Sequence, residues 1–245
     1  MRVILAILFV ALLGTFVSLG FWQLDRADEK RELFGAFADG NAAIAATALI
    51  EGDALAAHRY ERLRLNGRFL TSRQILLDWV THAGRVGYQV LTPFLPSGSE
   101  NWVVVNRGWI AAAPDRGELP DLEVAENDRM IVGQIDALPR PGLRLDVPEE
   151  TVSASWPRAL LFPTFDELRA ELELPLVDYQ ILLAADQPDG FIREWQPRSI
   201  TPERHQGYAL QWFSLAAALV AITAAVTTKA VLRARRLRDE RRTGP

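Results

Sequence analysis

The sequence predicts a membrane protein of the α+β class, in which two transmembrane helices flank a β-rich extracytoplasmic domain. Three observations support this prediction. Two long uncharged segments lie near opposite ends of the 245 residues. The residues between them resemble a water-soluble domain, with strand-like runs at short spacing. A cluster of basic residues directly follows the second uncharged segment.

The first uncharged segment covers residues 3–21. At 1.5 Å per residue, it has about the length that crosses a hydrocarbon layer of roughly 30 Å. A cleaved signal peptide is the alternative, and it would have a shorter apolar run that ends in small residues. This run ends instead in Leu-Gly-Phe-Trp at residues 19–22. We therefore expect an uncleaved transmembrane helix over residues 3–21.

The second uncharged segment covers residues 209–228. Its middle could belong to a buried helix of a soluble protein, but its C-terminal flank is typical of a membrane helix that leaves the bilayer on the cytoplasmic side. This flank contains Lys229, Arg233, Arg235, Arg236, Arg238, Arg241 and Arg242. The sequence therefore predicts a transmembrane helix over 208–228 and a basic cytoplasmic tail over 229–245.

The distribution of charge predicts the orientation. Arg2 precedes the first span and the basic tail follows the second, so both termini are expected in the cytoplasm of a bacterium. Residues 22–207 would then form a periplasmic domain anchored in the cytoplasmic (inner) membrane. This domain has 19 of the 27 Lys and Arg but 29 of the 31 Asp and Glu, a net charge of −10. Such a charge excludes nucleic acid as a partner, whereas Trp22 and Trp212 fit the outer interface of a lipid bilayer.

The central domain is predicted to be a mainly antiparallel β-sandwich or open barrel with one or two short helices. Strand-like runs cover 62–70, 74–80, 87–95, 101–110, 129–137, 154–162 and 177–185. Thr164, three residues before Glu167, predicts a helix with a capping box. Residues 25–37 are predicted to continue the first helix as an amphipathic segment that ends at Asp39-Gly40.

Several chemistries are not supported by the sequence. The chain has no cysteine, which excludes a thiol oxidoreductase, a cysteine-ligand copper carrier and an iron–sulfur protein. Its three histidines lie outside any His-Glu-x-x-His pattern, and no serine has a Gly-x-Ser-x-Gly context. We therefore expect no enzyme and no metal site made of protein ligands alone.

Residues 106–109, Asn-Arg-Gly-Trp, end an apolar strand-like run. Two interpretations remain open from the sequence. Arg107 can extend its charged end to the surface while Trp109 closes the core. Alternatively, Arg107 donates charge-assisted hydrogen bonds to an acidic ligand beside a flat aromatic wall.

His205 lies just before the second span. If the helix has already begun there, His205, Tyr208 and Trp212 lie along one stripe of its surface, together with Ala209 and Phe213. A histidine at a membrane surface is more often a simple hydrogen-bonding group. This stripe nevertheless has what an amphiphilic haem requires, namely an axial ligand, apolar walls and nearby arginines for the propionates.

The order of these motifs resembles the Surfeit locus protein 1 family of cytochrome c oxidase assembly factors. The resemblance covers nearly the whole chain. It rests on Leu-Gly-Phe-Trp-Gln-Leu-x-Arg at 19–26, Gly-Tyr-Gln-Val-Leu-Thr-Pro-Phe at 87–94, Val-Val-Val-Asn-Arg-Gly-Trp at 103–109, and His-x-x-Tyr-Ala-x-x-Trp-Phe at 205–213. Any one of these motifs is weak, but four in this order between two spans are specific.

The resemblance implies a non-enzymatic role in delivering or retaining haem a while the largest subunit of cytochrome c oxidase, subunit 1, matures. Haem a synthase is then a further expected partner. The resemblance names His205 as the candidate ligand of the haem iron. The other expected haem contacts are Trp22, Tyr208 and Trp212 along the ring, and Arg26, Arg107 or Arg204 at the propionates. The alternative is a haem-free membrane scaffold that docks oxidase subunits through its extracytoplasmic domain.

Overall fold

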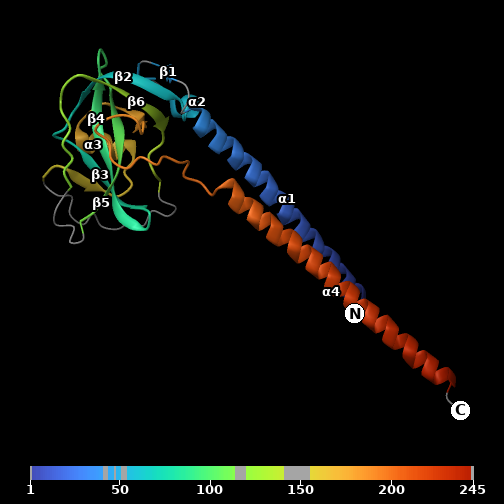
Figure 1. The fold of residues 1–245 in the computed structure, drawn as a ribbon. Coiled ribbons are helices and arrows are strands. Elements are labelled where there is room, and N and C mark those ends of the chain that lie inside the picture. The colour runs from blue at the N-terminus through green and yellow to red at the C-terminus, as the bar shows by residue number, and fades with distance from the viewer. Residues whose placement is uncertain are drawn as a thin grey trace. The chain divides into compact units, whose positions relative to one another are not determined.

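The computed structural model describes residues 2–40, 44–46, 48–50, 54–113, 120–140 and 155–243. The chain divides into two compact units, which are described separately. One unit consists of Met1–Gly35 and Pro197–Pro245, and the other of Ala36–Gln196. The first unit is helical and the second contains the β-strands (Figure 1).

The helical unit contains α4 (Pro202–Thr243) and all of α1 (Arg2–Gly40) except its last residues, which follow Gly35. Both are long and apolar enough to cross a membrane. Their apolar side chains are mostly exposed, and Ile7 of α1 and Ile222 of α4 are both 63% exposed. Exposed apolar surface of this extent is typical of segments that lie in lipid. The predicted helical continuation over residues 25–37 is confirmed, because α1 runs without a break to Gly40.

The second unit contains one eight-stranded sheet among its described residues. The strands are β1 (Ile44–Ala46), β2 (Arg62–Phe69), β3 (Ile75–His82), β4 (Arg85–Pro96), β5 (Trp102–Ala111), β6 (Arg129–Asp136), β7 (Arg158–Leu160) and β8 (Leu176–Leu183). Each of the seven predicted runs overlaps one of the strands β2 to β8, although Ala154, at the start of the sixth run, lies outside the described residues. The strand β1 and the short helix α2 (Ala54–His58) were not predicted.

The sheet closes on itself as a barrel. Its strand order is β1-β2-β6-β8-β5-β4-β3-β7, and β2 also pairs with β4. In that extra pairing Gly67 lies opposite Pro96 and Phe69 opposite Phe94. Strands β2, β6, β8, β5 and β4 therefore form a closed ring. Most pairings are antiparallel, so the predicted fold class is confirmed, with a closed barrel in place of the expected sandwich or open barrel.

The interior of the ring is an apolar core. The strand β2 alternates as predicted, since Leu63, Leu65 and Phe69 are buried while Arg64 and Arg68 are exposed. The same core receives side chains from the other four strands of the ring. These are Phe94, Val103, Val105, Ile131, Ile135, Tyr179, Ile181 and Leu183. The barrel is thus filled by its own side chains and is not a channel.

The helix α3 (Phe165–Leu172) covers a second apolar cluster of the sheet through Leu168 and Leu172. Its predicted capping box is confirmed. The Thr164 hydroxyl accepts a hydrogen bond from the N–H of Glu167 at 3.2 Å, and the Glu167 carboxylate accepts one from the N–H of Thr164 at 2.6 Å. These bonds satisfy N–H groups that the start of a helix otherwise leaves unpaired.

Replacing Thr164 by Ala should lower the free energy of unfolding by about 0.5–2 kcal/mol, because the N–H of Glu167 loses its acceptor. Chemical unfolding of the full chain in detergent, followed by circular dichroism, measures this change. The variant Thr164→Ser keeps the hydroxyl and should remain close to the wild type. Equal loss of stability in both variants would contradict the role of the cap.

Candidate functional site

The first turn of α4 places His205 on a helix. Pro202 is its first residue, where a missing N–H group and a fixed φ suit a helix start. The carbonyl oxygen of Thr201 accepts hydrogen bonds from the N–H groups of Arg204, at 3.2 Å, and His205, at 3.5 Å. The segment from His205 to Phe213 is therefore helical, as the predicted stripe of imidazole and aromatic rings requires.

Glu203 adds a negative charge to the same turn. Its own backbone N–H, followed by the Thr201 hydroxyl, lowers the pKa of its carboxyl group, and Arg31 of α1 adds a weaker attraction. A carboxylate at a helix N-terminus is also favoured by the helix dipole. The start of α4 is thus stabilised by groups immediately beside His205.

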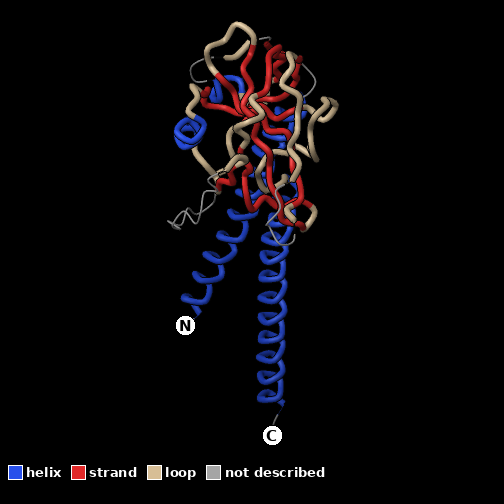
Figure 2. The backbone as a smooth tube through the Cα atoms, turned by 90° about the vertical axis from the view of Figure 1, so that its left-hand side faces the viewer, coloured by secondary structure: helices blue, strands red, loops and turns tan. Residues whose placement is uncertain are grey.

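The helices α1 and α4 pack antiparallel around Gly20. A Cβ atom at this position would lie 2.6 Å from the ring of Phe213, so the close approach requires a glycine. The ring of Phe21 meets that of Phe213 edge to face at 5.4 Å, and Phe16 lies 5.8 Å from Trp212. The two helices are further apart near the N-terminus of α1 (Figure 2). Aromatic rings around one glycine therefore hold the pair together at the end where His205 lies.

His205 lies between the two helices and is only 8% exposed. Its Nδ1 atom is 2.7 Å from Oε1 of Gln23 on α1. No hydrogen bond of Nε2 is found among the described residues. One ring nitrogen is thus engaged by the protein, and the other has no hydrogen-bond partner in the part of the chain that the structure describes.

Trp22 and Arg26 project from one side of the helix pair. The rings of Phe21 and Phe213 meet on the opposite side. Because successive helical residues are turned by about 100°, Trp22 and Arg26 of α1 lie on the same side as Tyr208 of α4. The Arg26 guanidinium is 5.7 Å from the centre of the Trp22 ring. Trp22 is 47% exposed and Tyr208 is 43% exposed. This side therefore presents aromatic surface and a cation.

The hydrogen bond between the helices also fixes their register. Trp22 is level with Tyr208 along the antiparallel pair. One turn beyond, further from the apolar segments, Arg26 is level with Arg204. Both arginines are exposed, and Arg26 also forms an ion pair with Glu29. The aromatic rings therefore lie nearer to the predicted membrane interior and the cations further from it.

Arg107 occupies a different environment, inside the β unit, where it is 1% exposed. Burial lowers its pKa to about 10, so the guanidinium is still charged at neutral pH. Its hydrogen-bond acceptors are the backbone oxygens of Asp189 at 2.7 Å, Leu122 at 3.0 Å and Glu123 at 3.3 Å, and Oε1 of Gln74 at 3.0 Å. The guanidinium N–H groups thus donate to oxygens of the barrel and its loops, and few of them could donate to a ligand.

Comparison with known proteins shows the family of this chain. Residues 10–217 match the SURF1 family. The chain belongs to the SURF1 family. A SURF1-like protein of Rickettsia felis is 31% identical over 218 residues, which cover 84% of this chain and 89% of the relative. A SURF1-like protein of Rickettsia conorii is 29% identical, with 84% of each chain covered. The resemblance drawn from the motifs is confirmed, and with it a place among the oxidase assembly factors.

Residues 106–109, part of one of the motifs shared with the SURF1 family, connect β5 to neighbouring segments of the barrel. Asn106 is fully buried and donates hydrogen bonds to Oε1 of Gln89 and of Gln180, both at 3.1 Å. Gly108 has a φ of +112°, and a Cβ there would lie 2.6 Å from the carbonyl oxygen of Ile192. Trp109 pairs with Ile192 as an isolated bridge. The contacts of this motif support a structural role, but Arg107 is buried and does not extend its charged end to the surface, as the first interpretation expected.

Gln23 is the residue that the sequence interpretation missed. It belongs to the SURF1 motif at residues 19–26, next to Trp22, but was given no role. The helical period could have predicted a role for Gln23, because a polar residue that faces a partner helix requires a hydrogen-bond partner. Gln23 and His205 are 182 positions apart in the sequence, and no local sequence pattern predicts a contact between residues so far apart.

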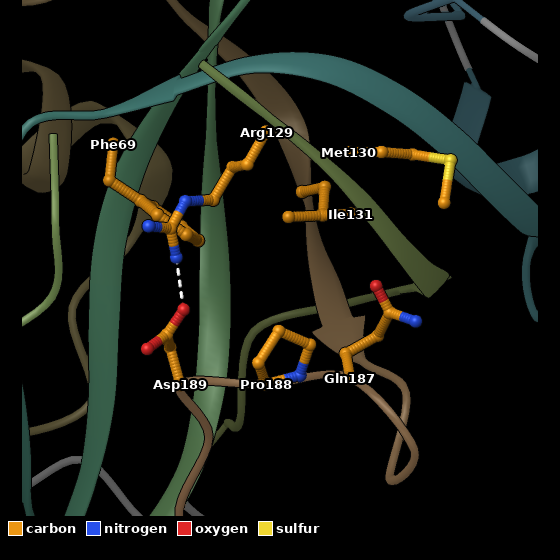
Figure 3. Close-up of a pocket in the computed structure, with 7 residues that line it drawn as sticks. All are labelled: Phe69, Arg129, Met130, Ile131, Gln187, Pro188 and Asp189. Atoms are coloured by element: carbon orange, nitrogen blue, oxygen red, sulfur yellow. Dashed lines mark hydrogen bonds and ion pairs between the residues drawn. The ribbon is translucent and has the colours of Figure 1, made fainter. Parts of the chain in front are cut away.

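A cavity of about 240 Å³ opens in the β unit between β2, β6 and the loop after β8 (Figure 3). An ion pair between Arg129 and Asp189 closes one end. Its other lining residues are Phe69, Met130, Ile131, Gln187 and Pro188. It is smaller than the roughly 300–1,000 Å³ of typical small-molecule sites, and it contains none of the predicted site residues. Nor do the described residues contain a cluster of three or more His, Cys, Asp or Glu suited to a metal ion.

Proposed function

We propose that this protein is a membrane-bound assembly factor that binds haem a and delivers it to subunit 1 of cytochrome c oxidase. One observation above all supports this proposal. His205, at the contact of two candidate membrane helices, has Nδ1 engaged by Gln23, and its Nε2 has no hydrogen-bond partner among the residues that the structure describes. A neutral imidazole nitrogen with a lone pair is the usual axial ligand of haem iron.

The surrounding residues fit an amphiphilic, planar ligand. Trp22 and Tyr208, which lie within about one turn of the imidazole along the helix pair, would pack along the ring. Trp212, which contacts Phe16 about two turns closer to the apolar segments, would extend this aromatic surface. Arg26 and Arg204, one turn further from the apolar segments, would pair with the propionates. Haem a would supply the iron centre, and this chain would hold it by ligation, stacking and charge.

Arg107, also expected at the propionates, is left out of the proposed site. Its guanidinium donates to oxygens of the barrel unit and is shielded from solvent. A ligand would have to break those bonds before it could pair with the cation, and the free energy lost would exceed the gain from one new pair. Its proposed role is structural.

The proposed topology places both termini in the bacterial cytoplasm and residues 22–207 in the periplasm. The basic residues after the second apolar segment support this orientation, because Lys and Arg are enriched on the cytoplasmic side of membrane helices. The haem site would then face the periplasmic surface of the bilayer. From there the chain would receive haem a from haem a synthase and pass it to oxidase subunit 1.

Purification with haem a available tests the proposal. The full chain is co-expressed with haem a synthesis, isolated in detergent and analysed for haem per chain. The variant His205→Ala should lose most of the bound haem, since it lacks the iron ligand. The variant His58→Ala removes a partly exposed histidine of the β unit and should bind haem like the wild type. Unchanged haem content in His205→Ala would remove His205 from the site.

The haem-free scaffold is the other outcome of this experiment. A chain without haem absorbance that still captures oxidase subunits in a pull-down would favour it. In that case the aromatic side of the helix pair would contact the subunits themselves.

A further inference from the structure

The contact between Gln23 and His205 has a chemical consequence that builds on the proposed function. The two atoms in contact are Oε1 of Gln23 and Nδ1 of His205, 2.7 Å apart. An amide oxygen has lone pairs and no hydrogen, so it can only accept. The imidazole must therefore donate through Nδ1, and in the neutral ring Nε2 then bears the lone pair.

We infer that Gln23 is a positioning residue, which fixes His205 as the Nδ1–H tautomer and directs its Nε2 lone pair to the iron of a bound haem. Histidines that ligate metals commonly donate their other ring N–H to an oxygen acceptor, which sets both the tautomer and the orientation of the ring. In this chain the acceptor comes from the opposite helix. The ligand geometry thus depends on α1 and α4 being packed together.

The packing around the pair supports this role. The close approach at Gly20 brings the helices together beside Gln23. Ala27 on α1 and Ala209 on α4 are each only 1% exposed, so small residues keep the two backbones near each other on both sides of the hydrogen bond. Side chains held in this way lose little entropy when they form their bond, and the ring is kept in one orientation before a ligand arrives.

The tautomer can be measured without haem. The full chain, labelled with ¹⁵N at histidine and held in detergent without haem, is examined by long-range ¹H–¹⁵N correlation NMR at alkaline pH, where ordinary imidazoles are neutral. The nitrogen that bears hydrogen resonates well upfield of the other. His58 and His82 complete the set of three histidines, and substitution of each identifies its signal.

Wild-type His205 should carry its hydrogen on Nδ1. In Gln23→Leu this preference should be lost in favour of Nε2–H, the form that dominates in free neutral histidine. Gln23→Glu keeps an acceptor and should keep the Nδ1–H form. Gln206→Leu is the matched control, because Gln206 is exposed on α4 next to His205. A wild-type Nε2–H tautomer, or the same tautomer in Gln23→Leu, would overturn the inference.

Titration of the same proteins with ferric haem a adds the second readout. Loss of an acceptor behind a ligating histidine typically weakens metal binding about 10- to 100-fold, so Gln23→Leu should bind less tightly by such a factor, and Gln206→Leu should not. Equal affinity in both would show that Gln23 does not position a ligand. If His205→Ala binds haem a undiminished, the proposed function loses its ligand, while the tautomer result from haem-free protein still stands.

Discussion

Replacing Arg107 by Met should destabilise the barrel by about 3 kcal/mol or more. Its guanidinium donates to oxygens from three separate parts of the chain: Gln74, the backbone at Leu122 and Glu123, and the backbone at Asp189. Methionine has a similar length but no donor. Each buried acceptor left without a partner costs about 1–3 kcal/mol, and several are left at once.

Thermal unfolding of the full chain in detergent measures this effect. For a chain of this size, about 3 kcal/mol corresponds to a drop in Tm on the order of 10 °C. Arg85→Met is the matched control, since Arg85 is exposed at the start of β4, and it should change little. Arg107→Lys keeps the charge but not the planar fork of donors, so it should also be destabilised. A wild-type Tm in Arg107→Met would contradict the structural role.

Gly20→Leu is expected to separate α1 from α4 at their contact. A Cβ at residue 20 would lie 2.6–2.9 Å from three ring atoms of Phe213, and the rest of a leucine side chain would occupy the same space. Overpacking of this kind costs about 1–3 kcal/mol. The helices would relieve it by moving apart, which would break the hydrogen bond between Gln23 and His205.

The absence of cysteine from the chain makes this separation measurable. Cysteines introduced at Leu24 and Gln206, both exposed, provide two unique sites for spin labels. Distances from pulsed EPR should lengthen and broaden in Gly20→Leu. They should be unchanged in Gly14→Leu, because a Cβ at residue 14 meets no atom within 4 Å. Equal distances in both variants would show that Phe213 yields to the new side chain and the helix contact survives.

Most of the fold was predictable because its signals are local. The strand β2 alternates apolar and polar residues, and the alternation alone gives its buried face. The start of α3 follows from Thr164 and Glu167, three residues apart. The membrane helices follow from two uncharged stretches of sufficient length. Each of these patterns lies within one element and needs no knowledge of its neighbours.

The closure of the barrel and the partners of the site residues were not predictable in this way. Closure depends on β2 meeting β4 across an intervening strand, a pairing that hydrophobic alternation does not encode. The sequence shows that Arg107 is charged but not what its guanidinium binds. An acidic ligand was as reasonable an expectation as the carbonyl oxygen of Asp189, 82 residues away. The bond between Gln23 and His205 depends on the register of two distant helices.

The ends of the sheet restrict how a second protein can recognise the barrel. The outermost strands β1 and β7 have three residues each, and the part of β3 that extends past β7 is interrupted by a bulge between Leu77 and Val80. Short and irregular borders offer few unpaired backbone groups to an incoming strand. A protein that binds this domain is therefore expected to contact its side chains and loops. Binding by addition of a strand to the edge of the sheet is not expected.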